Sequence, residues 1–373
     1  MSLLVFIFIL SILILVHEWG HYIAAVRCGV KVEQFALGFG PKLWSRFNKQ
    51  GTEFCLCAFP LGGYVKMAGD ERGRCTGQTG EFLAKSVGQR AWIVLMGPLV
   101  NVVLAYVCFW FVFVIGFVDM DASARKVDPR VGQVLSGSPA QKAGLLTGDK
   151  ILTIDGKTIR HWPDVQENIM QSTAPVLTVV LARGSDVLTK AIAPQESMQK
   201  DIFGRTHRTR RIGVGPVQIE NAGDVVVVRY GFWGSFSRAG QELADITVKT
   251  YRALYEMCIG LRSPKEAMGI VGMFFVIKFA LSVGFAFLLH IVGVISASLA
   301  IFNLLPLIPL DGGHLFLLGV EKIRGRALSV RIDQAIARVG FGLILTLALF
   351  VFYVDFERIG LIDKIIHVLK PMG

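Results

Sequence analysis

The sequence predicts an α-helical membrane protein with four transmembrane helices, a membrane-associated β-hairpin and an inserted extracytoplasmic β-rich domain. Composition is the first observation: of 373 residues, 53% are hydrophobic and 18% charged, and the mean hydropathy is +0.54, well above the usual range for soluble chains. The second is a set of four long apolar stretches, and the third is a polar segment with alternating apolar residues between the second and third stretches. A soluble enzyme, a disordered chain and a disulfide-stapled domain are thereby excluded.

Charged residues delimit the four spans. The first covers 1–26, where no Lys or Arg precedes Arg27, so we expect an uncleaved helix with its N-terminus outside and no signal peptide. The other spans are expected at 91–118, at 279–312 and at 337–354. The remaining segments are expected to be a loop at 27–90, a β-rich domain at 125–220, interfacial helices at 231–278, a loop at 313–336 and a tail at 355–373.

The basic residues predict the orientation of the chain. There are 39 Lys and Arg against 28 Asp and Glu, for a formal net charge of +11. Basic residues mark the loops of a membrane protein that stay in the cytoplasm, and ten of them lie in 27–90 and five in 312–338. We therefore expect both loops to face the cytoplasm and the β-rich domain to be extracytoplasmic. Nucleic acid is not an expected partner.

The segment between the second and third spans shows domain character. Alternating apolar runs at 150–154, 176–181 and 187–193 are separated by glycine-containing turn signals. Residues 138–145 (SPAQKAGL), followed by Gly148-Asp149 and then Ile154 to Lys157, resemble a bacterial PDZ domain. The resemblance implies a groove that binds peptide ends by strand addition. A spacer or size filter is the alternative, and both interpretations stay open.

Residues 232–257 have the pattern of a helix with two faces. Charged residues recur at steps of three and four, opposite large apolar residues. We expect this part of 231–278 to lie along the outer face of the membrane. It is either a plain connector or a gate that contacts substrate.

The chemistry is concentrated in the first span, at His17-Glu18-Trp19-Gly20-His21. On a helix, His17 and His21 project from one face about one turn apart and can bind one Zn²⁺, while Glu18 is placed to accept a proton from a metal-bound water. Ionisable residues inside a membrane span are costly and usually have a functional partner. The alternative is a polar seam of neutral histidines and a protonated glutamate.

A catalytic zinc site needs a third protein ligand and an open position. Asp311, in the sequence Leu310-Asp311-Gly312-Gly313 after the third span, is the candidate, because both spans enter from outside and reach compatible depths. An aspartate that only caps a helix is the alternative.

Several motifs along the chain resemble those of the site-2 protease family of intramembrane zinc metalloproteases, in its bacterial sigma-E-pathway type. They are HEWGH at 17–21, FALGFGP at 35–41, PLGGYVKM at 60–67, Gly97-Pro98 with Asn101, and NLLP at 303–306 leading to LDG at 310–312. The resemblance implies His17, His21 and Asp311 as zinc ligands and Glu18 as general base. The chain departs from the well-known gammaproteobacterial members, which carry two tandem PDZ domains, because it has room for only one.

The resemblance also implies substrate-binding residues. Residues 53–67, with Gly62, Gly63 and Tyr64, are expected to form a hairpin that dips back into the membrane and holds an extended substrate by strand addition; an ordinary cytoplasmic hairpin is the alternative. Pro306 breaks the third helix before Asp311. Asn303 either hydrogen-bonds the substrate backbone or satisfies the carbonyl groups freed by that break.

The function expected is that of an intramembrane zinc endopeptidase. It would cleave the transmembrane segments of single-span proteins in the bacterial inner membrane, with its active site toward the cytoplasmic side. Anti-sigma factors or remnant signal peptides are the substrates that the resemblance implies, and the lipid bilayer and peptide ends are the other expected partners. The alternatives are a non-catalytic PDZ receptor or adaptor with a structural zinc site, and a metal transporter.

Overall fold

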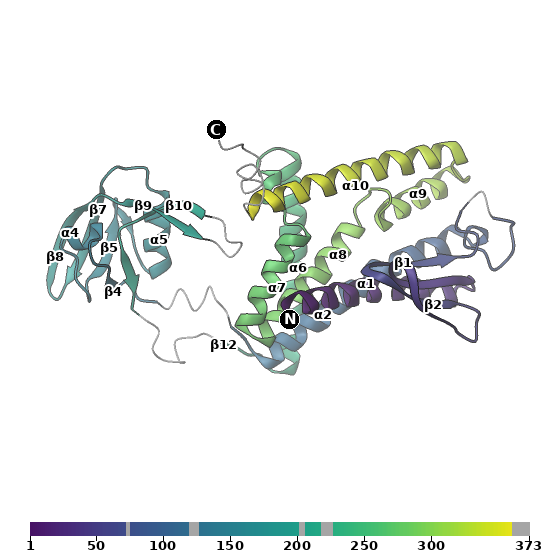
Figure 1. Cartoon of the computed structure of the whole chain (residues 1–373), viewed down its shortest axis with the longest axis horizontal. Coiled ribbons are helices and arrows are strands. Elements are labelled where there is room, and N and C mark those ends of the chain that lie inside the picture. Colours follow the sequence, from purple (N-terminus) through teal and green to yellow (C-terminus); the bar gives the residue numbers. More distant parts are fainter. Residues whose placement is uncertain (72–74, 119–126, 201–205, 218–226, 360–373) are drawn as a thin grey trace, which may run out of the picture. The chain divides into compact units, whose positions relative to one another are not determined.

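A computed structural model describes residues 1–71, 75–118, 127–200, 206–217 and 227–359 of the chain (Figure 1). The expected tail at 355–373 falls mostly outside these residues. The chain divides into two compact units, one comprising 1–115 with 230–357 and the other 116–229 with 358–373.

Within the described residues, four helices of the first unit are long and apolar enough to cross a membrane. They are α1 (Ser2–Arg27), α2 (Val87–Ile115), α8 (Phe285–Asn303) and α10 (Val330–Arg358). At about 1.5 Å per residue, the 26 residues of α1 reach farther than the hydrocarbon thickness of a bilayer.

Small residues let α1, α2 and α8 approach closely. A Cβ added at Gly20 of α1 would lie 2.3 Å from the carbonyl oxygen of Met96 in α2, and one at Gly293 of α8 would lie 2.6 Å from the Phe109 ring. Ser296 Oγ of α8 donates a hydrogen bond to the Asn101 carbonyl oxygen of α2 at 2.9 Å. Close backbone approach and such interhelical hydrogen bonds are what hold helices together in lipid.

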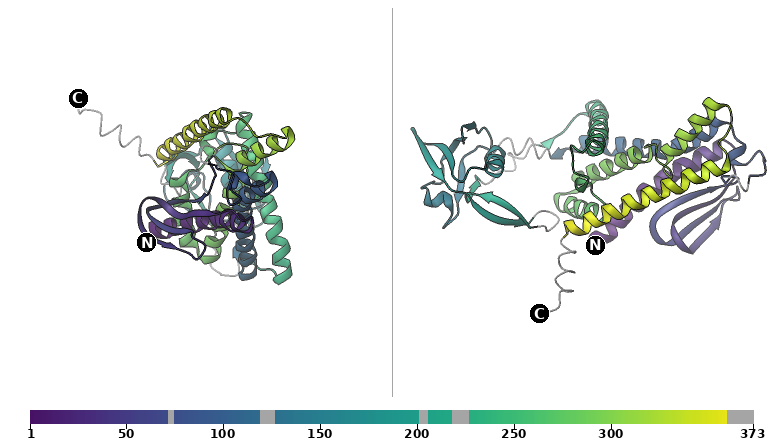
Figure 2. Two further views of the ribbon diagram at one scale, coloured as in Figure 1. Left: turned by 90° about the vertical axis from the view of Figure 1, so that its right-hand side faces the viewer. Right: turned by 90° about the horizontal axis from the view of Figure 1, so that it is seen from above.

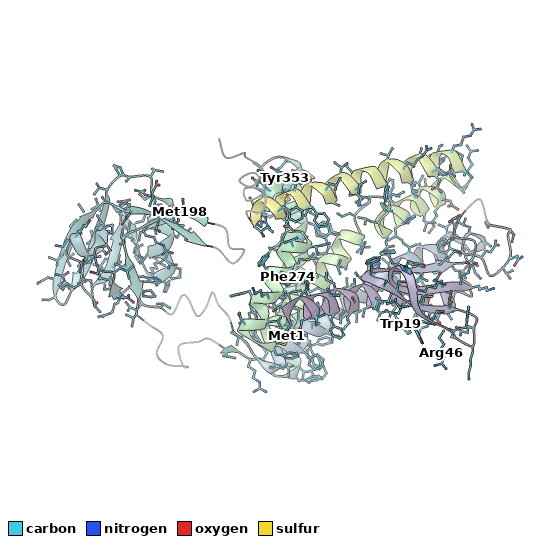
Figure 3. The ribbon with its side chains drawn as sticks, in the orientation of Figure 1. Met1, Trp19, Arg46, Met198, Phe274 and Tyr353 are labelled. Atoms are coloured by element: carbon cyan, nitrogen blue, oxygen red, sulfur yellow. The ribbon has the colours of Figure 1, made fainter. Side chains whose placement is uncertain are left out.

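The third apolar stretch is not one helix. It is divided between α7 (Ile270–Val283) and α8, and the break is at Gly284, whose φ of 136° favours glycine. The expectation of a span starting at 279 is therefore wrong. The apolar sequence continues through Gly284, but the helix is interrupted there. Phe274 of α7, labelled in Figure 3, packs edge-on against Phe6 of α1, and the ring centroids are 5.6 Å apart.

Of the interfacial segment expected at 231–278, only α6 (Phe232–Cys258) is two-faced. It crosses the direction of α1 and α8 (Figure 1; Figure 2, left). The 3-10 turn Pro264–Glu266 follows it. Helix α7 after that turn is apolar except for Lys278, so the expected alternation of charged and apolar faces stops before α7.

Strands β1 (Val32–Phe47) and β2 (Glu53–Met67) form an antiparallel hairpin with several register irregularities. Residues 34–37 pair with 63–66 and also with 53–56, so the long strands bend and fold into a compact sheet. The expectation of a hairpin inside 53–67 is wrong, since this segment is one strand of a hairpin with β1. Trp19 of α1 contacts Phe35 and Phe54 of this sheet, at centroid distances of 5.6 and 6.4 Å.

Asp311 does not end the third span but begins a separate helix, α9 (Asp311–Arg324). Most of the loop expected at 313–336 is therefore helical, and the fourth span starts earlier than expected, at Val330. The short 3-10 helix Phe82–Ala84 precedes α2.

The second unit contains a four-stranded antiparallel sheet in the order β6-β5-β7-β8. These strands are β5 (Lys150–Ile154), β6 (Lys157–Thr158), β7 (Leu177–Arg183) and β8 (Asp186–Ile192). Two-stranded pairs join β9 (Gln195–Lys200) to β10 (Thr206–Arg211), β4 (Val131–Val134) to β11 (Val214–Pro216), and β3 (Phe117–Val118) to β12 (Val227–Val228).

Alternating residues of this sheet build a core of the second unit. Leu177, Val179 and Leu181 of β7 are fully buried and pack against Val165 and Ile169 of a neighbouring helix. That helix is α5 (Trp162–Gln171), and a single turn, α4 (Pro139–Lys142), is capped by Ser138. The unit therefore has its own hydrophobic core, as expected of a separately packed domain.

Candidate metal centre

Three side chains from distant parts of the sequence converge in the first unit. His17 Nε2 lies 3.1 Å and His21 Nε2 3.5 Å from Asp311 Oδ2, and the two Nε2 atoms are 3.2 Å apart. Both histidines are buried. Two nitrogens and one carboxylate oxygen thus point at a common position.

These distances fit one bound zinc ion. Ligand atoms at roughly 2.05 Å from a tetrahedral zinc ion lie about 3.3 Å from each other. Asp311 Oδ2 is also buried without a well-aligned hydrogen-bond donor among the described residues, although two imidazoles lie beside it. A buried anionic oxygen in this state needs a cation. Within the described residues the group has three members, and a tetrahedral zinc ion bound by three side chains would keep its fourth position for water or substrate.

Helix α2 fixes the ring of His21. The ring Nδ1 donates a hydrogen bond to the carbonyl oxygen of Ile93 at 2.9 Å. A carbonyl oxygen only accepts, so the proton of the neutral imidazole lies on Nδ1 and the lone pair of Nε2 is left for a metal.

His17 has a corresponding neighbour in α2. Its Nδ1 lies 3.5 Å from the side-chain amide of Asn101, a residue with no exposed surface. The amide oxygen of Asn101 is buried without a partner among the described residues. A half-turn of this amide would supply an acceptor for the Nδ1–H, which again leaves Nε2 for a metal.

Gly97 allows α2 to lie against both imidazoles. A Cβ at this position would be 2.2 Å from His21 Nε2 and 2.9 Å from His17 Cε1. Any side chain here would displace the rings, because contacts this short do not occur between real atoms.

Asp311 reaches the histidines because α9 starts directly against the end of α8. A Cβ at Gly312 would lie 2.3 Å from the Leu304 carbonyl oxygen, and one at Gly313 would lie 2.6 Å from the Ile308 backbone nitrogen. The two glycines therefore let the first turn of α9 fold back on 304–308. This is the physical reason for the sequence Asp-Gly-Gly.

A cavity of about 720 Å³ opens from His17, His21 and Asp311. Glu18, Tyr64 and Asn303 line it. Gly63 lies beside Glu18. A Cβ added at Gly63 would be 3.2 Å from Glu18 Cγ. Pro306 and Gly62 are not among the residues that line this cavity, and Gly62 instead packs against the Phe39 ring.

The sequence profile of "Peptidase family M50" matches residues 5–347. This chain belongs to peptidase family M50. Full-length relatives carry names that class them provisionally as zinc metalloproteases. A Mesorhizobium japonicum protein is 32% identical over 368 residues, which is 95% of this chain and 98% of its own. A Rhizobium meliloti protein is 32% identical over 364 residues, with 94% and 95% covered, and a Clostridium acetobutylicum protein is 31% identical over 350 residues, with 94% and 96% covered. This M50 peptidase is therefore a multi-pass membrane protein and a zinc metalloprotease.

Among solved structures, the PDZ domain of the SdrC-like protein from Listeria monocytogenes aligns over 24% of this M50 peptidase and 85% of its own chain. The sequence identity is 22% and the TM-score is 0.20. A TM-score of this size does not by itself establish a common fold.

Two features of the site could not be predicted from the sequence. One is the Ile93 carbonyl, a backbone group that no motif can reveal. The other is the pair Arg90 and Glu321, both of which line the cavity. In the sequence, Arg90 is only a basic residue just before the second span, and Glu321 is only an acidic residue in the loop expected at 313–336.

Proposed function

We propose that this M50 peptidase is an intramembrane endopeptidase that cleaves the transmembrane segments of single-span proteins. The observation that carries the proposal is the position of the metal centre inside a candidate membrane span. His17 lies ten residues before Arg27, the end of α1, or about 15 Å at the rise of an α-helix. A substrate must enter the hydrocarbon region to reach it.

The proposed ligands are His17, His21 and Asp311. When bound there, zinc would polarise the scissile carbonyl and lower the pKa of water, the two contributions that Zn²⁺ makes in hydrolases. His21 is held in the required tautomer by Ile93. Asp311 supplies the negative charge that balances part of the charge of the ion.

Glu18 is proposed as the general base and then the general acid. Its carboxylate takes a proton from water as the oxygen attacks the carbonyl carbon, and it returns this proton to the amide nitrogen as the C–N bond breaks. The products are one new carboxyl group and one new amine. Glu18 ends the cycle ionised, as it began.

The edge of β2 at Gly63, Tyr64 and Val65 is proposed to hold the substrate. A transmembrane helix hides its carbonyl groups in hydrogen bonds, so it must be unwound and held extended before hydrolysis. Strand addition to β2, whose Tyr64 and Val65 line the cavity beside Glu18, would do this. Asn303, on the same cavity, is proposed to hydrogen-bond the substrate backbone.

Orientation and the second unit belong to the same proposal. The basic residues in 27–90 and 312–338 favour an active site that opens to the cytoplasm of a bacterial inner membrane. The second unit would then be extracytoplasmic. We assign it a PDZ-like role, in which it binds peptide ends or restrains substrates with large ectodomains.

Glu18→Gln tests the mechanism. We expect the purified variant to bind zinc like the wild type and to lose at least about 100-fold in the rate of cleavage of a tagged single-span substrate, the typical contribution of a general base. Zinc is measured by elemental analysis and cleavage by gel mobility in detergent. Equal cleavage by the two proteins would exclude Glu18 as the base.

A further inference from the structure

One face of the first half of α2, from Arg90 to Asn101, lies against the surroundings of the metal centre. Arg90, Ile93, Gly97 and Asn101 recur at steps of three and four and are all buried. Ile93 holds His21, and Asn101 lies beside His17. Arg90 reaches the helix that carries the third proposed ligand.

Arg90 and Glu321 form a bidentate ion pair between α2 and α9. Arg90 Nη2 lies 2.5 Å from Glu321 Oε1 and Nη1 lies 3.2 Å from Oε2. The side chains are only 7% and 13% exposed. Arg90 Nε donates a third hydrogen bond, to the Lys85 carbonyl oxygen at 3.2 Å. The guanidinium is thus oriented from both sides.

The ion pair lies at a distance from Asp311 but on the same side of α9. Asp311, His314, Leu318 and Glu321 all line the cavity, as expected of positions on one helix face. Glu321 is ten positions after Asp311, about 15 Å farther along the helix. Gly312 and Gly313 fix the first turn of α9 against 304–308, and Arg90 fixes the other end.

We propose that Arg90 and Glu321 are positioning residues for the metal ligand Asp311. A helix held only at its first turn can tilt about that turn, whereas two fixed points define its axis. The inference depends on the proposed role of Asp311 as a ligand. Helix α2 then supports all three ligands through separate residues: Asn101 for His17, Ile93 for His21, and Arg90 with Glu321 for Asp311.

The chemistry of the pair favours orientation over stability as its role. Buried ion pairs add little net stability compared with apolar residues of similar volume. What a guanidinium and a carboxylate provide is a planar geometry with two parallel hydrogen bonds, which lysine cannot reproduce. Arg90→Lys therefore keeps the charge and removes the fixed geometry.

Zinc affinity and the visible spectrum of the cobalt(II)-substituted protein test the inference. We expect Arg90→Lys and Glu321→Gln to weaken zinc binding about 10-fold. This is the lower end of the loss known for groups that hydrogen-bond a metal ligand directly, because the pair acts on Asp311 only through α9. The cobalt(II) absorption bands should also change in intensity, because they report coordination geometry. The exchanged variant, Arg90→Glu with Glu321→Arg, should recover most of the affinity and the wild-type spectrum.

Arg252→Met is the matched control. It removes an arginine from an exposed ion pair with Glu256 on α6, and zinc affinity should not change. Wild-type affinity and spectrum in both Arg90→Lys and Glu321→Gln would overturn the inference, as would an equal loss in the exchanged variant when its thermal unfolding matches that of the wild type. If the wild type itself bound no zinc, the proposed function would fail instead.

Discussion

Gly97 illustrates how a single residue of α2 leaves room for the two histidine rings of the proposed metal centre. The rings of His21 and His17 occupy the space that a side chain at this position would fill. The i, i+4 spacing of the histidines predicted from the sequence that the two rings lie on one helix face, and the structure places them together. The space they need was not predictable, because it depends on the packing of α1 against α2.

Gly97→Ala should therefore abolish stoichiometric zinc binding. The added Cβ would displace both imidazole rings, and the two Nε2 atoms could then no longer both lie about 2 Å from one zinc ion. Zinc content of the purified protein is the measurement. Gly88→Ala is the control, because a Cβ at this position of α2 meets no atom within 4 Å. If both variants kept one zinc per chain, the described approach of α2 to the histidines would be incorrect.

Among the helices and strands, the structure differs from the sequence prediction where a helix ends inside an apolar stretch or begins inside an expected loop. The apolar stretch that includes 279 continues through Gly284, but the helix does not. Asp311 begins α9, a helix that was expected to be part of a loop. Composition predicted the number of spans, whereas the breaks depend on glycine conformations and tertiary contacts. The pair Arg90 and Glu321, 231 residues apart, could not be found from periodicity.

Helix α7 is capped from another element. Asp355 of α10 is buried and accepts hydrogen bonds from the backbone N–H groups of Gly269, Val271 and Gly272. Asp355→Ala should lower the stability of the first unit by about 1–2 kcal/mol, as expected for the loss of an N-cap. Thermal unfolding in detergent measures this. Asp245→Ala, on the exposed side of α6, is the control, and an equal shift in both variants would contradict the capping role.

At the scale of the molecule, the two units are separately packed, and a change in the second should not alter the metal centre of the first. Asp149 of the second unit is buried and accepts hydrogen bonds from Arg183 Nε at 2.7 Å and from the Leu146 N–H at 2.9 Å. Burial raises the pKa of Asp149, but the hydrogen bonds from Arg183 and Leu146 outweigh it, so the pKa lies below the ordinary value of 3.8.

Asp149→Asn should destabilise the second unit by about 2 kcal/mol, the typical value of hydrogen bonds to a charged group, and leave zinc content unchanged. Because the pKa is depressed in the folded state, the carboxylate contributes stability above pH 3.8 and loses it as the pH falls further. Limited proteolysis at several pH values should show a smaller acid sensitivity in the variant. A loss of zinc in the variant would contradict the independence of the units.

X-ray absorption at the zinc edge of the purified protein is the decisive measurement for the proposed metal centre. We expect one zinc ion with two imidazole nitrogens, one carboxylate oxygen and one further light atom, and loss of one imidazole contribution in His17→Ala. A sulfur ligand, or an unchanged spectrum in the His17 variant, would contradict it.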